Sequence, residues 1–535
     1  MPDMPADRPG RTWWRDGVLY QIYPRSFMDS NGNGIGDLEG IRRRLDHLVW
    51  LGVDGIWLSP CFPSPMKDFG YDVADYCDID PAFGSLADFD HLLAEAHARG
   101  IRIVLDFVPN HTSDHHPWFV ESRRDRASSK RDWYVWRDPK PDGSPPNNWL
   151  AAFGGGAWEW DEATAQFYLH SFLKEQPDLD WRNGQVERAM HGVLRFWLDR
   201  GVDGFRIDVV QKLVKDAELR DNPLVEGVTG YFGQRHIHDE NHPDVHALLR
   251  RLRALLDGYP ERIAVGEVYL FDPPEVAKYY GRGDELHLAF NFNFTFSPWS
   301  AEAFRERIEA FERALPPEAW PDVVLSNHDS SRHASRFDDP EWGEDRARVA
   351  ALMLLTLRGT PFLYYGEEIG MRDVPIPEES MQDPLAHNVH PKLGRDPERT
   401  PMQWEPGPGA GFGSAQPWLP VGADADVRNV LGQRADPASL LHLYRDLIAL
   451  RRDTPALYAG SYRTLASPPE VLAYERVAPG SRAVVALNFG TEPRRVDLGS
   501  GAIVGGLCTR WGAALPQSVD DVALGPSEGV VLLLG

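Results

Sequence analysis

The stretch Gly204-Phe-Arg-Ile-Asp-Val209 decides the fold, because a short apolar run ends there in an arginine and a carboxylate. Three other segments are built in the same way and end in charged or imidazole side chains: Asp106-Phe-Val-Pro-Asn-His111, Gly266-Glu-Val-Tyr269 and Ser326-Asn-His-Asp329. An unpaired carboxylate out of water is costly, so packing alone does not explain these charged ends. A barrel of parallel strands carries functional side chains at its carboxyl ends. The segments therefore predict such a barrel with a site at one end.

Short apolar runs alternate with amphipathic segments over most of the chain. Strands are expected at Val18–Pro24, Val53–Ser59, Ile101–Val108, Gly204–Asp208, Ile263–Val268, Leu286–Phe292, Val323–Asn327 and Pro361–Tyr365. Helices are expected at Ile41–Trp50, Leu86–Arg99, Val186–Arg200, Val245–Leu256, Pro274–Tyr280, Ala301–Leu315, Asp345–Leu357 and Leu440–Arg451. Eight strands alternating with eight helices predict an α/β protein, a (β/α)8 barrel.

Two long stretches interrupt this alternation. The first follows the third strand and is rich in Trp, Gly and Pro, and the second is a Pro-rich loop after the eighth strand. Beyond about Pro455 helix signals stop, and runs such as Val484–Asn488 and Val530–Leu534 predict a C-terminal β-sandwich. The predicted parts are the first barrel segment (1–108), an inserted small domain (109–183), the rest of the barrel with its long loop (184–455) and the β-sandwich (456–535).

Composition restricts the class of partner. Asp and Glu number 80 against 56 Lys and Arg, which gives a net charge of -24 over 535 residues. Such a surface repels nucleic acid and anionic membranes and suits a neutral or cationic ligand, although it also simply favours solubility. The three cysteines are few and odd in number, which suits a reducing compartment. Because we find no apolar signal segment and no run long enough to span a bilayer, we expect a cytoplasmic protein.

Alternation along a strand predicts the first pair of reactive groups. Arg206 and Asp208 point to the same side, and a guanidinium lowers the pKa of a neighbouring carboxyl, which suits a nucleophile. An ordinary ion pair is the alternative. Glu267 follows the apolar run Ile263–Val265, where desolvation raises a carboxyl pKa as a general acid requires. Two such carboxyls are the machinery of glycoside hydrolysis, and a third, such as Asp329, can stabilise a cationic transition state.

In this order and spacing, the four segments resemble the α-amylase family, glycoside hydrolase family 13. Supporting segments also match: Gly52–Pro60, Gly70–Tyr76, Gln176–Trp181 and Gly359–Gly366. The resemblance is strong over residues 13–455 and weak beyond. It implies a retaining reaction on α-glycosides and a neutral sugar as substrate.

The resemblance also implies a role for individual residues. Asp208 corresponds to the nucleophile, Glu267 to the general acid/base and Asp329 to the transition-state stabiliser. Retention requires the first two carboxyls to lie about 5–5.5 Å apart. The residues that correspond to substrate-binding positions are Tyr71, Asp72, Asp106, His111, Arg206, Val209, His328, Arg332 and Arg399.

Further segments resemble the exo-acting branch of the family. In that branch, Gln176–Trp181 and Arg399–Trp404 have counterparts, and the counterparts of Asp72 and Arg399 bind the terminal 4-hydroxyl of the sugar. Val209, directly after the nucleophile, resembles enzymes that accept α-1,6 bonds. Ser330-Ser331 replaces the Gln-Pro that is more common beside Arg332 in the family, so the resemblance does not determine the specificity for the acceptor.

The segment Asp29-Ser-Asn-Gly-Asn-Gly-Ile-Gly-Asp37 alternates oxygen-bearing side chains with glycines, like a calcium loop. In the family, the matching loop holds a structural Ca²⁺ or Mg²⁺. The corresponding ligands are Asp29, Asn31, Asn33, the Ile35 carbonyl and Asp37. A Gly/Asn turn that needs no ion is the alternative.

Together these features predict an exo-acting α-glucosidase that cleaves terminal glucosyl residues from short oligosaccharides with retention. A transglucosylase or a trehalose- or sucrose-converting isomerase would use the same covalent intermediate. A non-catalytic transporter subunit of this fold would lack Asp208 and Glu267, which are both present.

Overall fold

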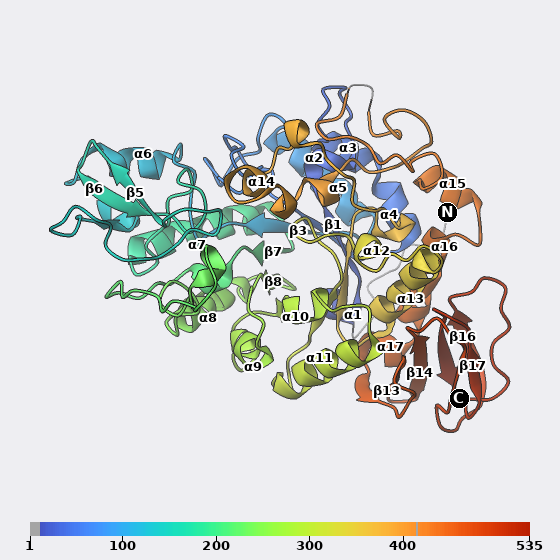
Figure 1. Ribbon diagram of the computed structural model, residues 1–535. Coiled ribbons are helices and arrows are strands. Elements are labelled where there is room, and N and C mark those ends of the chain that lie inside the picture. Colours follow the sequence, from blue (N-terminus) through green and yellow to red (C-terminus); the bar gives the residue numbers. More distant parts are fainter. Residues whose placement is uncertain (1–10, 414–415) are drawn as a thin grey trace.

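The computed structural model describes residues 11–413 and 416–535, and its centre is an eight-stranded parallel sheet (Figure 1). The strands are β1 (Leu19–Ile22), β2 (Gly55–Leu58), β3 (Arg102–Phe107), β7 (Gly204–Ile207), β8 (Ile263–Gly266), β9 (Leu288–Ala289), β10 (Asp322–Val324) and β11 (Thr360–Tyr364). Their order is β10-β11-β1-β2-β3-β7-β8-β9, so all eight predicted strands are present. The predicted (β/α)8 barrel is confirmed.

The barrel is nearly closed, because within the described residues no ladder joins β9 to β10. β9 has only two residues, and the chain then turns into helix α10 (Phe292–Thr295). Across the seam, the hydroxyl of Thr295 donates a hydrogen bond to the carbonyl of Val324 at 2.9 Å. A side chain thus makes the connection that a longer strand would otherwise make.

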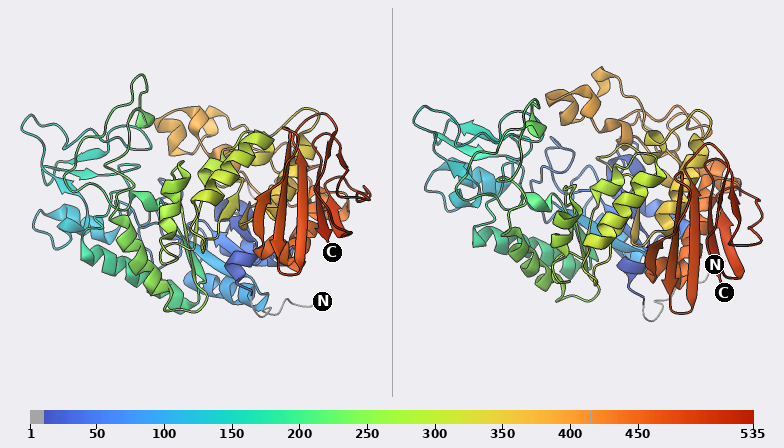
Figure 2. Two further views of the ribbon diagram at one scale, coloured as in Figure 1. Left: turned by 90° about the horizontal axis from the view of Figure 1, so that it is seen from below. Right: turned by 60° about the horizontal axis from the view of Figure 1, so that its bottom comes forward.

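The outer helices follow the predicted positions closely, and two views from below show them around the sheet (Figure 2). They are α3 (Leu38–Arg43), α4 (Leu45–Leu51), α5 (Leu86–Ala98), α7 (Gly184–Arg200), α8 (Val245–Leu256), α9 (Pro273–Ala277), α11 (Ala301–Ala314), α13 (Gly343–Thr356) and α16 (Leu440–Asp453). The single helix expected at Ile41–Trp50 is instead two helices. They meet at Arg44, whose φ of -104° and ψ of 4° are not helical.

The stretch after β3 folds around a core of its own. It contains α6 (Pro117–Arg124), η1 (Arg131–Trp133) and a three-stranded antiparallel sheet in the order β4-β6-β5. These strands are β4 (Trp136–Arg137), β5 (Trp158–Asp161) and β6 (Gln166–Leu169). Its core contains Trp149, Trp158 and Phe167. This unit projects to the left of the barrel in Figure 1 and lies inside the predicted range 109–183.

The C-terminal residues form two antiparallel sheets. One has the order β12-β13-β14-β18-β16 and the other pairs β15 with β17. The strands are β12 (Ser461–Thr464), β13 (Val471–Ala478), β14 (Ser481–Asn488), β15 (Arg494–Val496), β16 (Ile503–Cys508), β17 (Val522–Leu524) and β18 (Gly529–Leu534). Along β13, Val471 and Ala473 pack between the sheets, whereas Leu472 and Tyr474 join the core of the barrel side. The period of two produces the expected sandwich.

One helix was not expected in this region. Helix α17 (Pro455–Ala459) lies where helix signals were predicted to stop. Its proline occupies the first turn, where the missing N–H costs nothing and the fixed φ suits a helix. The proline therefore begins a short helix and does not mark the end of helical structure.

The remaining elements are short. Four helices and the first 3-10 turns lie in barrel loops: α1 (Trp13–Asp16), α2 (Pro24–Phe27), η2 (Val210–Lys212), η3 (Tyr231–Gly233), η4 (Lys278–Tyr280), α12 (His333–Arg336) and α15 (Val430–Ala435). The loop after β11 adds η5 (Glu367–Ile369), η6 (Glu378–Ser380), α14 (Pro384–Asn388), η7 (Pro391–Leu393) and η8 (Asp396–Arg399). No helix in the described part of the chain is both long and apolar enough to cross a membrane.

Candidate active site

The register of neighbouring strands brings the first charged groups together. Asp106 of β3 pairs with Arg206 of β7, and Arg206 pairs in turn with Val265 of β8. Beyond the strands, the N–H of Asp208 still bonds to the carbonyl of Phe107 at 2.9 Å. The ladder therefore continues to the catalytic positions and fixes their backbone.

One buried guanidinium connects three carboxylates. Arg206 Nη1 donates to Asp106 Oδ1 at 2.8 Å and to Asp208 Oδ1 at 2.7 Å. Its Nη2 lies 2.6 Å from Glu267 Oε2. The Arg206 side chain is 1% exposed, so little water competes for these contacts. Three carboxylates around one cation leave the cluster with excess negative charge, which favours retention of a proton.

The pKa of Asp208 differs from the sequence expectation. Burial, together with the nearby Glu267 and Asp106, raises the pKa of Asp208 well above its usual range, although Arg206 acts to lower it. Arg206 does lower the pKa of Asp208 as expected, but the expected net lowering was wrong, because desolvation and two like charges outweigh one cation.

The contacts between Asp208 and Glu267 suit a retaining reaction. Both carboxylates contact the same guanidinium. Retaining enzymes hold their two carboxyls about 5–5.5 Å apart, whereas inverting enzymes space them about 6.5–9.5 Å apart, and a shared guanidinium suits the shorter spacing. Val209 lies between them in a left-handed conformation with φ of 36°, and its N–H donates to Glu267 Oε2 at 3.1 Å. Such strain in a β-branched residue is typical of functional sites.

Asp329 lies beyond the end of β10 and is surrounded by cations. Its Oδ1 accepts from Arg395 at 2.9 Å and from Arg399 at 2.7 Å. Its Oδ2 lies 3.1 Å from His328 Nε2. Although burial acts in the opposite direction, these three groups hold the pKa of Asp329 well below its usual range. Asp329 is therefore ionised, as a stabiliser of positive charge requires.

Two aromatic rings position the imidazole of His328. The Tyr71 ring stacks on it at 5.4 Å between centroids, and the Tyr71 hydroxyl lies 2.5 Å from Nε2. Gln21 Nε2 lies 2.8 Å from Nδ1, and Trp57 meets the ring edge-on. Burial lowers the pKa of His328 well below its usual range, so the ring is neutral. Tyr71 also donates to Asp106 Oδ2 at 3.1 Å, which joins this group to the Arg206 cluster.

His111 is held by Tyr71, Asn110 and Gln176. Its Nε2 lies 3.1 Å from the Tyr71 carbonyl and 3.1 Å from Gln176 Nε2, and Asn110 Nδ2 lies 3.1 Å from its Nδ1. Burial lowers the pKa of His111 to about 4, so it too is neutral at physiological pH. Protein partners at both ring nitrogens therefore fix the orientation of each of the two histidines.

The charged pair expected from Asp72 and Arg399 is not formed. Asp72 accepts from Ser64 Oγ at 2.8 Å and from the backbone N–H groups of Lys67 and Asp68, so it stabilises its own loop. Arg399 instead binds Asp329 and the carbonyl of His328. The sequence expectation was wrong for this pair because the segment holds two aspartates, and only the loop conformation decides which one turns inward.

A different pair closes this end of the site. Asp68 Oδ1 lies 2.8 Å from Arg395 Nη2, and Arg395 also binds Asp329 and Asp383. Gln176 donates to Asp68 Oδ2 at 3.1 Å. Sequence reasoning missed Asp68, Arg395 and Asp383, although Asp68 stands three residues before Tyr71. The positive φ of Phe69, 47°, marks the tight turn that directs Asp68 inward.

Arg332 was expected to bind substrate, but its side chain does not reach the site. Its guanidinium donates to the carbonyls of Tyr365 at 2.7 Å and Glu398 at 2.9 Å, and it lies over the Tyr364 ring. The side chain is buried and both of its terminal nitrogens donate to these carbonyls, so its role is to hold the loop after β11 against the barrel. The neighbouring Ser331 hydroxyl donates to Asp373.

The glycine-rich loop Asp29–Asp37 gathers oxygen atoms. Asp29 Oδ1 accepts from the N–H groups of Asn31 at 3.1 Å and Gly32 at 2.6 Å, and Asn31 Nδ2 donates to Asp37 Oδ2 at 3.2 Å. Asp37 also caps α3 by accepting from the N–H of Gly40. Asn31 turns its amide nitrogen to Asp37, but this short loop also holds the carboxylates of Asp29 and Asp37 and the amide oxygen of Asn31, and oxygen ligands of this kind suit a hard cation such as Ca²⁺ or Mg²⁺.

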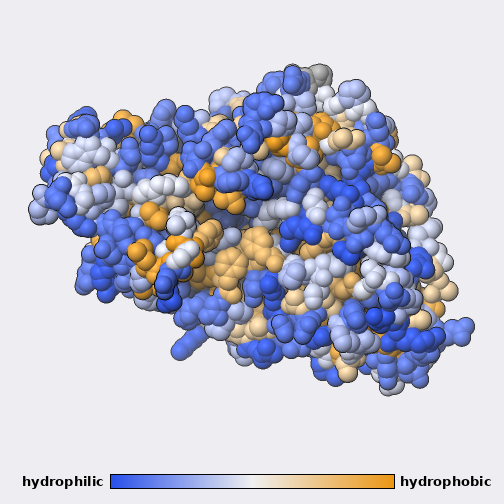
Figure 3. Space-filling model, viewed as in Figure 1, coloured by the Kyte–Doolittle hydropathy of each residue, from blue (hydrophilic) through white to orange (hydrophobic). Residues whose placement is uncertain are grey.

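The site opens to solvent on one face. A space-filling view shows a hollow near the middle of that face, with apolar side chains on its border (Figure 3). Loops that follow β7, β8 and β11 surround the strand ends, as Figure 1 shows. The charged side chains described above therefore lie at the carboxyl end of the barrel, where functional groups of this fold gather.

Comparison with known proteins identifies the class. The family model for the α-amylase catalytic domain matches residues 21–460, and the chain belongs to this family. A probable alpha-glucosidase of Rhizobium meliloti (strain 1021) is 46% identical over 92% of each chain. An oligo-1,6-glucosidase of Parageobacillus thermoglucosidasius is 40% identical over 90% of this chain and 91% of its own length.

Solved structures agree with this placement. The α-glucosyl transfer enzyme XgtA superposes with a TM-score of 0.93 at 41% identity and covers 98% of this chain and 100% of its own. A mutant of the trehalulose synthase MutB gives a TM-score of 0.90 at 35% identity, with the same coverage. The relatives of this chain therefore include both hydrolases and glucosyl-transferring enzymes.

Proposed function

We propose that this protein is a retaining exo-acting α-glucosidase, a glycoside hydrolase that releases the terminal non-reducing glucosyl residue of short oligosaccharides. The observation that carries the proposal is the guanidinium of Arg206, which holds Asp208 and Glu267 together at the ends of two adjacent strands. Relatives named alpha-glucosidase and oligo-1,6-glucosidase, at 46% and 40% identity, support the same activity.

The first step forms a covalent intermediate. Glu267 donates its proton to the glycosidic oxygen, the bond from C1 to that oxygen breaks, and Asp208 forms a new bond to C1. Asp329, held ionised by its cations, stabilises the positive charge that develops on the sugar ring.

The second step releases glucose. Glu267, now ionised, takes a proton from water, and the water oxygen attacks C1 while the bond to Asp208 breaks. Each step inverts the configuration at C1, so the product keeps the α configuration. Arg206 remains in contact with both carboxylates and balances the charge that moves between them.

Exo specificity follows from the closed end of the site. Asp68, Arg395 and Asp383 form a buried ionic group beyond Asp329, and a sugar chain cannot continue through it. Placing a further sugar there would break these ion pairs and leave buried charge without a partner, which costs about 3–5 kcal/mol. A single glucosyl unit is therefore the largest group that fits between Asp68 and the nucleophile.

Two variants test the mechanism with maltose and α-glucosyl fluoride. Asp208→Asn should abolish the hydrolysis of both, because it removes the nucleophile. Glu267→Gln should lower kcat for maltose by about 10²–10⁴-fold. With α-glucosyl fluoride it should still release fluoride in a first-turnover burst, because that leaving group needs no proton, and then turn over slowly, because the second step lacks its base. Far-UV circular dichroism serves as the control for folding. Unchanged activity of Asp208→Asn would contradict the mechanism.

Glucosyl transfer is the second candidate, because the solved relatives XgtA and MutB are named for transfer and isomerisation. Water and a sugar would then compete for the same intermediate. Product analysis on maltose, isomaltose, trehalose, sucrose and starch separates the two. Free glucose as the main product supports the hydrolase, whereas dominant oligosaccharide or sucrose isomers favour transfer. Val209 leads us to expect activity on isomaltose.

We also propose that the Asp29–Asp37 loop binds a structural Ca²⁺ or Mg²⁺. The ligands would be Asp29, Asn31, Asn33, the Ile35 carbonyl and Asp37, and the carboxylates of Asp29 and Asp37 in this short loop support the proposal. Chelation should then lower Tm, and added Ca²⁺ should restore it. In the variant Asp29→Asn, chelation should have no further effect. A Tm independent of chelator would contradict the proposal.

A cytoplasmic location is our further proposal. Cys61, Cys77 and Cys508 are all free, which is typical of proteins from a reducing compartment. Activity that is unchanged by a reducing agent agrees with this location, and cell fractionation tests it directly.

A further inference from the structure

A cavity of about 490 Å³ lies at the amino end of the barrel, opposite the end that carries the catalytic carboxylates. Its wall includes residues that stand just before four strands: Arg15 before β1, His287 before β9, Trp320 before β10 and Arg358 before β11. These strands are consecutive around the barrel and include the seam, where within the described residues no ladder joins β9 to β10. Helix α17 forms one side and contacts α1, as Figure 1 shows. The cavity therefore lies where the barrel wall is incomplete.

Three guanidinium groups line the cavity, those of Arg15, Arg253 and Arg358. A carboxylate holds each of them, and the pairs are Arg15 with Asp16 at 2.6 Å, Arg253 with Asp257 at 2.7 Å and Arg358 with Glu312 at 3.0 Å. Within the described residues, Nη1 of Arg15, Nη2 of Arg253 and Nε of Arg358 have no hydrogen-bond partner. Each guanidinium is therefore fixed in place and keeps a donor nitrogen for an oxyanion such as phosphate, which arginine binds well.

The charge of the cavity differs from that of the whole protein, whose net charge is -24. Among the described residues of the wall, Glu318 is the one carboxylate beside three arginines. The carboxylates that hold the arginines are not wall residues, so an anion inside the cavity lies nearer to the cations than to them. A concave site with an excess of one charge concentrates ligands of the opposite charge. The cavity therefore favours an anion.

His287 adds a neutral hydrogen-bond donor to the wall. Its Nδ1 accepts from the backbone N–H of Ala264 at 3.0 Å. Burial, followed by the charge of Arg253, lowers the pKa of His287 to about 3, so the ring is neutral and carries its hydrogen on Nε2. Glu318, which is exposed, is an acceptor in the same wall. The cavity thus offers a donor and an acceptor to hydroxyl groups, which themselves both donate and accept.

Two tryptophans give the wall an apolar part. Trp14 meets His287 edge-on at 5.1 Å between ring centroids, and Trp320 is 9% exposed. Cavities of about 300–1,000 Å³ that combine aromatic side chains with a few polar groups are typical of sites for small molecules. A bare phosphate ion leaves the tryptophans in contact with water, whereas the C–H groups of a sugar ring cover them.

We propose that this cavity binds a phosphorylated monosaccharide. The phosphate accepts hydrogen bonds from Arg15, Arg253 and Arg358, and the sugar ring lies against Trp14 and Trp320. The ligand binds without any change in its covalent bonds. Because the cavity and the catalytic carboxylates lie at opposite ends of the barrel, the inference does not depend on the proposed function.

Isothermal titration calorimetry on the full chain tests this inference, with glucose 6-phosphate as the probe. Glucose 6-phosphate should bind about 10-fold or more tightly than inorganic phosphate, because its ring buries apolar surface. Arg15→Met and Arg253→Met should each weaken this binding by about 10-fold or more, because each removes a charge-assisted hydrogen bond. Trp14→Ala should leave glucose 6-phosphate no tighter than inorganic phosphate.

Arg313→Met is the matched control, because Arg313 lies on α11, is mostly exposed and does not line the cavity. It should not change the binding of glucose 6-phosphate. Asp208→Asn should bind the probe as the wild type does, which separates the cavity from the catalytic site and holds whether or not the protein hydrolyses maltose.

Three results would overturn the inference. One is binding of glucose 6-phosphate that both arginine substitutions leave unchanged. Another is inorganic phosphate that binds as tightly as glucose 6-phosphate, because the tryptophans then contribute nothing. The third is AMP that binds more tightly than glucose 6-phosphate, because the cavity then selects a nucleotide and not a sugar.

Discussion

At the scale of single residues, a few arginines in the site each contact several carboxylates. Arg206 contacts Asp106, Asp208 and Glu267, and Arg395 contacts Asp68 and Asp329. Because burial disfavours the charged form, each carboxyl has a pKa set by its own neighbours. The pKa of Asp329 is therefore lowered, whereas the pKa of Asp208 is raised.

Asp68 allows this balance to be tested through pH. Burial raises the pKa of Asp68 to about 6, above the value of about 3.9 in the unfolded chain. The folded protein therefore holds this proton more tightly, and the stability it contributes is present below pH 4 and lost as pH rises through 6. The asparagine of the variant Asp68→Asn does not titrate, so the variant does not lose this stability as the pH rises. Its Tm relative to the wild type should rise between pH 4.5 and pH 7.5, by an amount that corresponds to at most about 3 kcal/mol.

Calorimetric scans of both proteins at several pH values measure this difference. A constant difference for Asp68→Asn would contradict the raised pKa.

At the scale of elements, most strands and helices could be predicted because their patterns are local. The apolar runs predicted all eight strands. The helical spacing of Phe304, Ile308 and Phe311 predicted α11. The break between α3 and α4 could not be predicted, since no Gly or Pro marks it around Arg44 in the sequence. Likewise, a loop conformation that several distant segments hold together decides that Asp68, and not Asp72, contacts Arg395.

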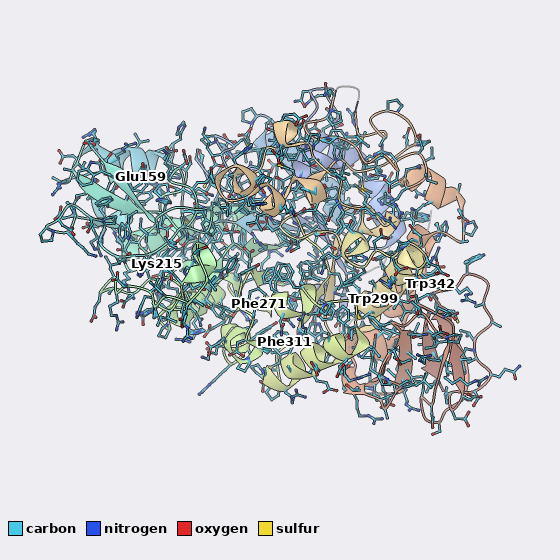
Figure 4. The ribbon with its side chains drawn as sticks, viewed as in Figure 1. Glu159, Lys215, Phe271, Trp299, Phe311 and Trp342 are labelled. Carbon is cyan, nitrogen blue, oxygen red and sulfur yellow. The ribbon has the colours of Figure 1, made fainter. Side chains whose placement is uncertain are left out.

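A buried ion pair joins the loop after β7 to the inserted unit. Lys215 Nζ lies 2.8 Å from Asp178 Oδ2 and donates to Asn110 Oδ1 at 2.7 Å, next to His111; Figure 4 labels Lys215 at this junction. Breaking a buried pair leaves the other charge without a partner, which costs about 3–5 kcal/mol. Lys215→Met should therefore lower Tm clearly and raise KM for maltose, because His111 loses its support.

Arg220→Met is the matched control for Lys215→Met. Arg220 pairs with Asp216 in the same loop but is exposed, so its loss should leave Tm and KM unchanged. Equal effects of the two substitutions on Tm would show that the buried pair has no special role.

At the scale of the whole molecule, the barrel and the C-terminal sandwich share one core. Helix α13 is apolar on nearly all sides, because one face packs on the barrel and another contacts β14 and β18. Arg476 of the sandwich donates to the carbonyls of Thr356 and Gly460. A helix without a polar face needs cover on both sides.

Removal of residues 456–535 should therefore give an insoluble barrel, because it exposes Val349, Leu352 and their neighbours on α13. Expression of residues 1–455 followed by solubility and size-exclusion analysis checks this outcome. The intact protein should unfold in one thermal transition by fluorescence and circular dichroism. A soluble, active truncated barrel would contradict the shared core.

The sequence by itself determined the barrel, and its resemblance to a known family pointed to three candidate carboxylates, Asp208, Glu267 and Asp329. The barrel rests on local periodicity and the candidates on charged residues at strand ends, which a linear pattern records. Only the tertiary structure decided which aspartate closes the pocket, that Arg332 turns into the core, and that the pKa of Asp208 is raised. Each of these depends on burial and on neighbours far apart in the chain, and desolvation and Coulomb energy are properties of the folded surroundings.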